Sequence, residues 1–392
     1  MAKAALRLVE SPSHEEREVN LWRREDDDRG HSLHYLVSYP MSFPWTVPHF
    51  FIHKYTQKGD IVLDPFCGTG TTLLEAGLSG RVAYGVDTDP LAIRIAQAKI
   101  HPCDITEVTL KVQDLNFSRP AVLGRYQEFF SPFYDVATFR ELLGLRQCLS
   151  GAGPEANRDH SSNFVEALAL SLLHGHSAGY FSTYTYPQIA LSPKEQFELN
   201  LKRQQSPDYR AVAPRLLRKA AIVTSDGVPV ALRLRPSLHK VGVGDPRDLA
   251  FVETGSVSLT VSSVPYPGMR DLKKEQWLKV WFTGLNSEEA WHPNFDSMES
   301  WSEYMNEVLF ELARVTKSGG RAVLDTREIS VANSKILLDR ELLSLVDANL
   351  GRYWVPEVSL MQYADANYTS IGTQRNQAVQ GRDYRVVVLR RR

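Results

Sequence analysis

The sequence predicts an α/β fold, in which a doubly wound sheet is interrupted by one long helical insertion. Two observations support this prediction. Short apolar runs alternate with segments of helical spacing from residue 60 to residue 100, as in the opening of a βαβα unit. The strand pattern then stops over residues 104–239 and resumes between residues 240 and 390.

The first half of the sheet is expected from short buried strands that are each followed by a helix. Residues 60–64 (DIVLD) form an apolar run typical of a buried parallel strand, and residues 81–86 form a second one. Residues 71–79 and 90–100 follow with helical spacing, and Pro90 falls in the first turn, where proline is favoured. Another helix is expected to begin around residues 47–49.

The rest of the chain predicts the insertion and the second half of the sheet. Helix-like segments occupy the insertion at residues 137–149, 164–173 and 193–203, and strand patterns return at residues 240–243, 257–261, 321–324 and 384–389. An amphipathic helix over 301–315 precedes Lys317-Ser318-Gly319-Gly320, which predicts a glycine stop before the next strand. The predicted domains are a polar lead-in (1–30), a catalytic domain (31–103 and 240–392) and the helical insertion (104–239).

Composition excludes several classes of protein. The chain has 392 residues, of which 43% are hydrophobic, and 45 Lys+Arg against 46 Asp+Glu give a net charge of −1, so any nucleic-acid surface must be a local patch. No run approaches the roughly 18 apolar residues of a membrane span. The polar first 28 residues resemble no signal peptide, and the three cysteines have no metal-ligand spacing. We therefore expect a cytoplasmic protein without membrane contact or bound metal.

The strongest chemical signal is the string DPFCGTGTT, which lies between a predicted strand and a predicted helix. Gly68 and Gly70 allow the backbone to approach a ligand closely, and the N-terminus of the helix offers free N–H groups. Asp87 ends the next strand, where a carboxylate accepts hydrogen bonds from ribose hydroxyls. Leu73 occupies the position of the third glycine of a nicotinamide-binding fingerprint, which argues against that cofactor. A glycine turn without a ligand is the alternative interpretation.

This string resembles the S-adenosylmethionine-binding motif of DNA amino-methyltransferases, which reads DPF-x-G-[ST]-GTT. Residues 31–55 resemble the segment that closes over the methionine end of the cofactor in these enzymes, and 262–266 (SSVPY) resembles their catalytic loop. The resemblance implies a Rossmann-like class I methyltransferase domain with a helical insertion. It implies these cofactor-binding residues: Asp64, Pro65, Phe66, Gly68, Gly70, Thr71, Thr72, Asp87 and Asp245, the last near the adenine ring.

The catalytic residues implied by the resemblance are Ser263, Val264, Pro265 and Tyr266. The Ser263 side chain and the backbone carbonyl of Val264 would hold the two hydrogens of an exocyclic amine, while Tyr266 would stack on a base flipped out of the helix. Val264 replaces the first of two prolines that are usual in this loop, and we expect activity to survive because the other three residues remain. Serine at the first position favours cytosine N4, although some adenine N6 enzymes also carry it.

A local excess of basic residues between Lys194 and Lys240 predicts a DNA-binding surface. An aromatic stretch at 177–188 precedes it and is suited to contact with bases. The candidate DNA-binding residues are Lys202, Arg203, Arg210, Arg215, Arg218, Lys219, Tyr184 and Tyr186. An ordinary solvated helical face is the alternative interpretation.

Together these features predict a site-specific methyltransferase that acts on an exocyclic amine of double-stranded DNA, with cytosine N4 favoured. The resemblance also implies a role in restriction-modification or phage defence beside a cognate nuclease. Three alternatives stay open: adenine N6 methylation of DNA, methylation of a guanine amine in tRNA, and a catalytically silent DNA-binding relative.

Overall fold

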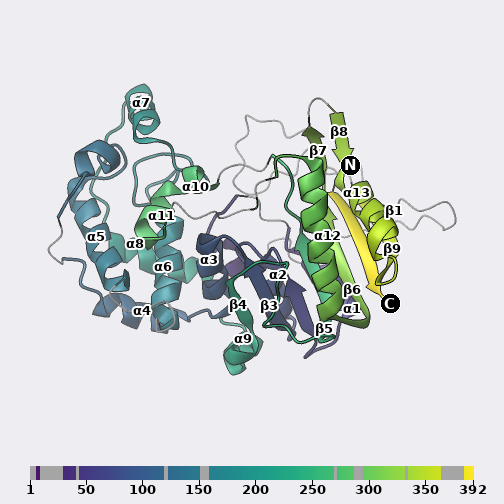
Figure 1. Cartoon of the computed structure of the whole chain (residues 1–392). Coiled ribbons are helices and arrows are strands. Elements are labelled where there is room, and N and C mark those ends of the chain that lie inside the picture. Colours follow the sequence, from purple (N-terminus) through teal and green to yellow (C-terminus); the bar gives the residue numbers. More distant parts are fainter. Residues whose placement is uncertain are drawn as a thin grey trace, which may run out of the picture.

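A mixed β-sheet runs through one part of the molecule, with helices on both faces (Figure 1). The computed structural model describes residues 6–8, 30–40, 44–118, 122–150, 159–268, 272–286, 293, 295–331, 334–362 and 384–392. Within these ranges eight strands form the sheet in the order β1-β9-β10-β6-β5-β2-β3-β4. The strands are β1 (Leu6–Leu8), β2 (Ile61–Asp64), β3 (Val82–Asp87), β4 (Lys240–Val243), β5 (Val257–Ser263), β6 (Thr316–Thr326), β9 (Trp354–Gln362) and β10 (Tyr384–Arg391).

The connectivity of the sheet reverses between strands β2 and β5. Strands β6, β5, β2, β3 and β4 pair in parallel, while β10 runs antiparallel to both β6 and β9. The chain moves outward from β2 through β3 to β4, and then returns to the other side of β2 as β5. In doubly wound sheets ligands bind at the carboxyl ends of the strands at such a reversal. The predicted fold class is confirmed, and the expected ligand crevice lies beyond Asp64 and Ser263.

Side chains alternate between the two faces of the sheet and build two cores. Val62 on β2 joins the core shared with α1 (Thr46–Tyr55), α2 (Thr71–Leu78) and α3 (Pro90–Ile100). Leu63, the next residue, joins the core shared with α12 (Met298–Val315) and α13 (Leu338–Leu345). This alternation follows from the pleat of a strand, which points successive side chains to opposite faces. The sheet is therefore covered on both faces, as its apolar strands predicted.

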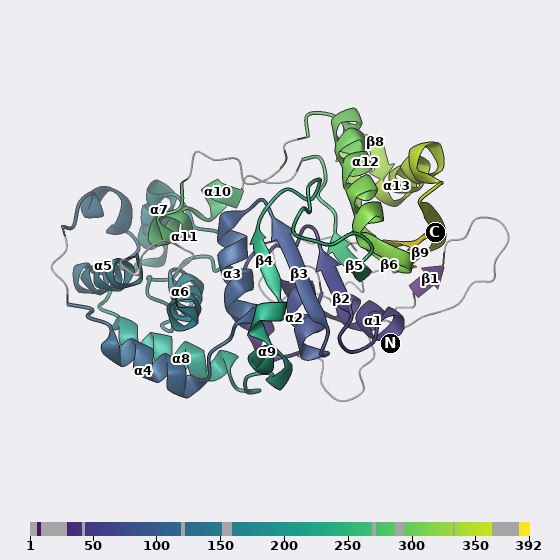
Figure 2. The ribbon, with the colours of Figure 1, turned by 60° about the horizontal axis from the view of Figure 1, so that its bottom comes forward.

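A helical unit lies beside the sheet, next to α3 (Figures 1 and 2). Its helices are α4 (Ile105–Asp114), α5 (Val136–Ser150), α6 (His160–Leu172), α7 (Pro193–Arg203), α8 (Val212–Val223), α10 (Leu272–Glu275) and α11 (Trp277–Thr283). The last two follow the SSVPY loop, yet α11 contacts α5 and α6, and Trp281 stacks on Phe139 with ring centroids 5.6 Å apart. Part of the predicted catalytic domain thus packs within the helical unit, where Trp277 and Trp281 pack, partly buried, against the hydrophobic core.

Smaller elements complete the described chain. They are the 3-10 turns η1 (Ser32–Tyr35) and η4 (Pro236–Leu238), the π-helical turns η2 (Tyr126–Phe130) and η5 (Val346–Leu350), the short helix α9 (Val230–Leu234) and the hairpin strands β7 (Glu328–Val331) and β8 (Ser334–Leu337). In the ranges that the structure describes, no helix has both the length and the apolar composition needed to cross a membrane.

The two glycines after α12 do not stop the helix, contrary to the prediction. The helix ends at Val315, and strand β6 begins at Thr316. Val257 of β5 pairs with Thr316 whereas Leu259 pairs with Arg321, so the glycines lie in a bulge of β6. A side chain at Gly320 would come within 3.0 Å of the Ser258 carbonyl oxygen, and therefore the bulge packs closely on β5 only because this residue is glycine.

Candidate active site

The predicted glycine turn connects the carboxyl end of β2 to the N-terminus of α2. Gly68 and Gly70 have φ angles of 48° and 79°, in the left-handed region that favours glycine. A Cβ on Gly70 would lie 3.0 Å from the Cβ of Ala96, so this glycine lets α3 pack against the turn. A Cβ on Gly68 would meet nothing within 4 Å, which leaves the turn open on the side facing away from the protein.

Asp64, the last residue of β2, connects the turn to the end of β5. Its carboxylate is buried and accepts hydrogen bonds from the Ser262 hydroxyl at 2.5 Å and from the Phe66 N–H at 3.2 Å. Burial raises the pKa of Asp64 to about 6. Thr72, in the first turn of α2, donates to the carbonyl of Val261 at 3.2 Å. The turn and the end of β5 are thus joined by side chains that cross the reversal of the sheet.

Asp87 ends β3 and lies beside the turn. Its Oδ2 accepts from the Gly68 N–H at 2.7 Å, and its Oδ1 accepts from the Asp89 N–H at 2.9 Å. Removal from water and the neighbouring Asp89 raise the pKa of Asp87 to about 7. Each carboxylate oxygen has a second lone pair, so Asp87 retains capacity to accept hydrogen bonds from a ligand.

The segment after residue 31 is tied to α2 through a buried carboxylate that sequence reasoning missed. Glu75 accepts from His34 Nε2 at 2.7 Å and pairs with His49 Nδ1 at 2.8 Å. Although burial alone would raise it, these two hydrogen bonds lower the pKa of Glu75 to about 2. In the same segment Tyr39 donates to Asp89, which caps the N-terminus of α3. The segment therefore lies against both helices that border the turn.

The predicted catalytic loop leaves the end of β5 next to β6. Ser263 pairs in register with Asp325, and the Val264 N–H donates to the Asp325 carbonyl at 3.1 Å. The indole N–H of Trp301 donates to the Pro265 carbonyl at 2.8 Å, and the Arg327 guanidinium lies over the Tyr266 ring at 4.2 Å. Valine at 264 thus makes a backbone hydrogen bond that proline could not make.

The Asp325 carboxyl is a buried acid beside the predicted catalytic loop, and the sequence analysis did not single it out. It lies in the buried last part of β6 and interacts with the Ser263 hydroxyl. Burial raises the pKa of Asp325 to about 6, although Arg327 and Ser263 oppose the rise. Its only sequence signal is its place near the end of a strand, which many structural residues share.

Asp245 follows β4 at the same edge of the sheet. The Gly244 N–H donates to the Asp87 carbonyl at 3.1 Å, and the Asp245 carboxylate pairs with Arg247 at 2.7 Å. The Arg247 guanidinium lies 5.1 Å from the ring of Tyr304, which in turn lies 6.3 Å from the ring of Phe66. The structure therefore brings the predicted cofactor residues and the predicted catalytic loop to one edge of the sheet.

Comparisons with known proteins identify this part of the chain. Residues 8–98 match the family model described as DNA methylase. The chain is 29% identical over 117 residues to the type II methyltransferase M.MjaII of Methanocaldococcus jannaschii, which covers 30% of this chain and 21% of that protein. It is 36% identical over 93 residues to the type II methyltransferase M.MvaI of Kocuria varians, covering 23% of this chain and 20% of that one. A third match, 64% identical over 33 residues, is to the tRNA (guanine(10)-N2)-dimethyltransferase of Methanocaldococcus jannaschii, with 8% and 9% covered.

The segment that matches the DNA methylase family model is N-terminal. It holds the glycine turn and Asp87, so the resemblance predicted from the sequence is confirmed there, and the match agrees with S-adenosylmethionine as cofactor. The chain spans about a fifth or less of the length of the curated relatives named above.

The predicted DNA-binding residues divide into two groups. Arg210 is buried, pairs with Asp208 at 2.9 Å and donates to the carbonyls of Ser177, Tyr180 and Ser182. Arg215 donates to the Ala178 carbonyl at 3.0 Å, and Lys219 donates to the Tyr35 carbonyl at 2.8 Å. These three side chains hold loops of the protein in place, so their charges contribute less to its surface than the sequence suggested.

The second group faces solvent. Lys202, Arg203 and Arg218 are exposed, and the Arg203 guanidinium lies 3.7 Å from the centroid of the Tyr184 ring. The backbone carbonyl of Tyr184 accepts from Gln196 and Gln205, each at 3.0 Å, while that of Tyr186 pairs with His174 at 2.8 Å. The aromatic stretch is therefore held in place through its backbone, and the side chains of Tyr184 and Tyr186 are only partly buried.

Proposed function

We propose that this chain is an S-adenosylmethionine-dependent methyltransferase that methylates an exocyclic amine of a base in double-stranded DNA. One observation carries the proposal: the glycine turn after β2 and the SSVPY loop after β5 meet at the reversal of the sheet, joined by the Ser262–Asp64 hydrogen bond. A cofactor seated on the turn would therefore lie next to a loop able to hold an amine. The match to type II methyltransferases supports DNA as the substrate.

The residues of the turn fit this cofactor. Gly68 leaves open space above the turn, and Asp87 offers lone pairs to ribose hydroxyls at the neighbouring strand end. Beside Asp245, the Phe66 ring is partly exposed and the Tyr304 ring is nearly buried. A planar ring system of the cofactor would pack against these two rings. When bound, S-adenosylmethionine supplies an activated methyl group, and positioning of the acceptor is then the main task of the protein.

The catalytic loop would hold the acceptor amine and receive its proton. The Ser263 hydroxyl and the Val264 carbonyl would accept the two amine hydrogens, which turns the nitrogen lone pair out of conjugation with the base. The proton that the amine nitrogen gives up on methylation would pass through the Ser263 hydroxyl to the Asp325 carboxylate. Asp325 suits this role because a pKa of about 6 leaves it ionised at neutral pH, yet basic enough to accept a proton.

Cytosine N4 is the favoured target because serine occupies position 263. Adenine N6 is the second candidate on the same loop. A guanine amine in tRNA is the third, and the match to a tRNA dimethyltransferase favours it. We also propose that the enzyme modifies DNA beside a cognate nuclease, in a restriction-modification or defence pair.

Label transfer from tritiated cofactor separates these candidates. The purified full chain is incubated with unmethylated double-stranded DNA and, separately, with unmodified tRNA, and the labelled nucleoside is identified by mass spectrometry. Label in N4-methylcytosine is expected. Label in N6-methyladenine or in a tRNA guanine would overturn the cytosine assignment. Absence of label although the cofactor binds would overturn the proposed methyl transfer and favour a catalytically silent DNA-binding protein. Ser263→Ala should abolish transfer, while Ser206→Ala, at an exposed position, should not.

A further inference from the structure

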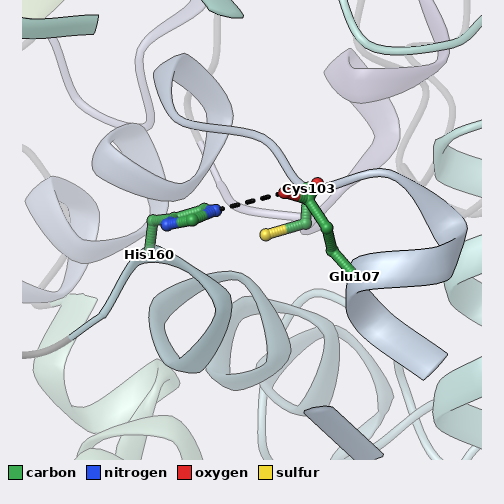
Figure 3. A group of neighbouring side chains, drawn as sticks. All are labelled: Cys103, Glu107 and His160. Atoms are coloured by element: carbon green, nitrogen blue, oxygen red, sulfur yellow. Dashed lines mark ion pairs between the residues drawn. The ribbon is translucent and has the colours of Figure 1, made fainter. Parts of the chain in front are cut away.

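Three side chains with different donor atoms converge outside the proposed active site. Cys103 lies in the turn after α3, Glu107 in the first turn of α4, and His160 is the first residue of α6. One sulfur, one oxygen and one nitrogen atom of these residues all lie within 4.8 Å of one another. Figure 3 shows the Cys103 sulfur beside the His160 ring, with the ring extended toward the Glu107 carboxylate.

The spacing of these atoms fits the edges of a tetrahedral metal site. Glu107 Oε1 and His160 Nε2 are 3.6 Å apart. Zinc–ligand bonds of about 2.0–2.3 Å place neighbouring ligand atoms about 3.3–3.6 Å apart in a tetrahedron. The distances within the cluster that exceed this range can shorten by side-chain rotation, because the His160 side chain is 55% exposed. Cys103, in contrast, is fully buried and fixes one corner of the site.

Hydrogen bonds already orient the carboxylate and both helix ends. Glu107 Oε2 accepts from the Asp104 N–H at 2.7 Å in a capping box, which leaves Oε1 directed toward His160. Asp159 caps α6 through the Ser162 N–H at 2.7 Å and pairs with Lys111 of α4 at 3.0 Å. Such outer contacts orient metal ligands and tune their affinity.

We propose that Cys103, Glu107 and His160 form a zinc-binding site with three protein ligands and one open position. Thiolate and imidazole ligands select zinc over magnesium or calcium, which prefer oxygen. A thiolate and a carboxylate balance the charge of the ion. Arg233, whose guanidinium stands 4.0 Å from Glu107 Oε1, balances that carboxylate in the absence of metal.

The site would fasten the helical unit to the catalytic sheet. It connects the turn after α3, which packs on the sheet, with the N-terminus of α6 in the helical unit. The Arg94–Glu166 pair joins the same two helices at 3.3 Å. Sequence reasoning expected no metal because the cysteines lack a recognisable ligand spacing, and only the fold brings residue 160 to residues 103 and 107.

Metal binding by the full, tag-free chain tests the proposal. The apo protein is titrated with Zn²⁺ against a chelating indicator, and with Co²⁺ to follow thiolate-to-cobalt charge-transfer absorption. One zinc per chain and a charge-transfer band are expected, with a Tm that rises with zinc concentration. Cys103→Ser should lower the zinc affinity by about 100-fold or more, since even outer-contact changes cost about 10–100-fold.

Two further variants keep the test decisive. His160→Gln changes an exposed side chain, so this variant should fold even if Cys103→Ser is unstable. The zinc affinity of His160→Gln should fall to the same extent as that of Cys103→Ser. Cys148→Ser removes a cysteine outside the cluster and should bind zinc like the unchanged chain. Equal zinc binding by all variants, or none by the unchanged protein, would overturn the site. Because these readouts need neither cofactor nor nucleic acid, they are independent of the proposed methyl transfer.

Discussion

The hydroxyl of Ser262 donates a 2.5 Å hydrogen bond to the carboxylate of Asp64, and so joins β5 to β2 where the sheet changes direction. Both side chains are almost completely buried. The neighbouring Ser263 is only partly buried and faces Asp325 on the other side of β5. Two adjacent serines thus have different roles, one holding the sheet together and one standing at the proposed reaction site.

Alanine substitutions should separate these roles. Ser262→Ala leaves the buried Asp64 carboxylate short of a donor and should lower the free energy of unfolding by about 1–3 kcal/mol at pH 8. Ser263→Ala should change stability by less than about 1 kcal/mol while abolishing methyl transfer. Urea unfolding and label transfer measure the two effects. Equal loss of stability in both variants would contradict the assignment.

The same pair gives stability a defined pH dependence. The folded-state pKa of Asp64, about 6, lies above its ordinary 3.8, so its contribution is complete below pH 4 and is lost as the pH rises toward 6. Without the Ser262 donor the pKa should rise further, and the loss of stability in Ser262→Ala should extend to higher pH.

Cofactor binding should strengthen as Asp87 ionises. The pKa of Asp87 is raised to about 7, and its carboxylate accepts ribose hydrogen bonds best when charged. The Kd from calorimetry should therefore fall as the pH increases from 5.5 to 7, by up to about tenfold per pH unit, and level off above pH 8.

Two asparagine variants control this experiment. Asp87→Asn should bind weakly with no pH dependence. Asp245→Asn should keep the pH dependence of the unchanged protein, because Arg247 lowers the pKa of Asp245 and keeps it ionised across this range. A pH dependence that persists in Asp87→Asn would assign the titration to another group.

Restoring the proline that is usual in the catalytic loop should harm this protein. Val264→Pro removes the N–H that donates to the Asp325 carbonyl, which should cost about 1 kcal/mol of unfolding free energy without raising turnover. Hydrogen exchange offers a second measurement, since the Val264 amide should be protected in the unchanged chain. A more stable or more active proline variant would refute this interpretation of the loop.

Charge reversal should separate surface charges from buried ones. Arg218→Glu, at an exposed position of α8, should weaken DNA binding and reduce the slope of log K against log salt by about one for each phosphate that the arginine neutralises. Arg352→Glu, an exposed change just before β9, should leave the slope unaltered. Arg210→Gln should instead lower Tm, because it removes the donor to three backbone carbonyls and the partner of Asp208. An unchanged slope in Arg218→Glu would move the DNA surface elsewhere.

The sequence was most informative where neighbours along the chain determine structure. The strand before Pro65, the glycine turn and the helix from Pro90 follow from apolar runs, left-handed positions and caps that act within a few residues. The bulge at Gly319 and Gly320 was misread because a glycine pair after a helix has the same pattern whether it ends the helix or lets two strands approach.

Contacts between distant residues could not be predicted from the pattern. The sequence suggests that Lys219 and Arg210 are surface charges. In the structure Lys219 donates to the Tyr35 carbonyl and Arg210 donates to the Ser182 carbonyl. Glu75 was not singled out in the sequence, but His34 and His49 pair with its buried carboxylate. In each case the residue type is visible in the sequence, whereas the element that buries it is fixed only by the tertiary fold.

The long insertion leaves and rejoins the sheet at one edge. Gln97, near the end of α3, donates to the Val241 carbonyl of β4 at 3.4 Å, and His239 accepts from the Ala83 N–H of β3 at 3.0 Å. The two ends of the insertion are therefore adjacent in the fold, and the described strands keep their order around it. Such an arrangement would allow the insertion to be replaced without disturbing the strand order of the sheet. A replacement insertion would need to carry matching aromatic partners for Trp277 and Trp281, which follow β5 in the chain yet pack in the helical unit.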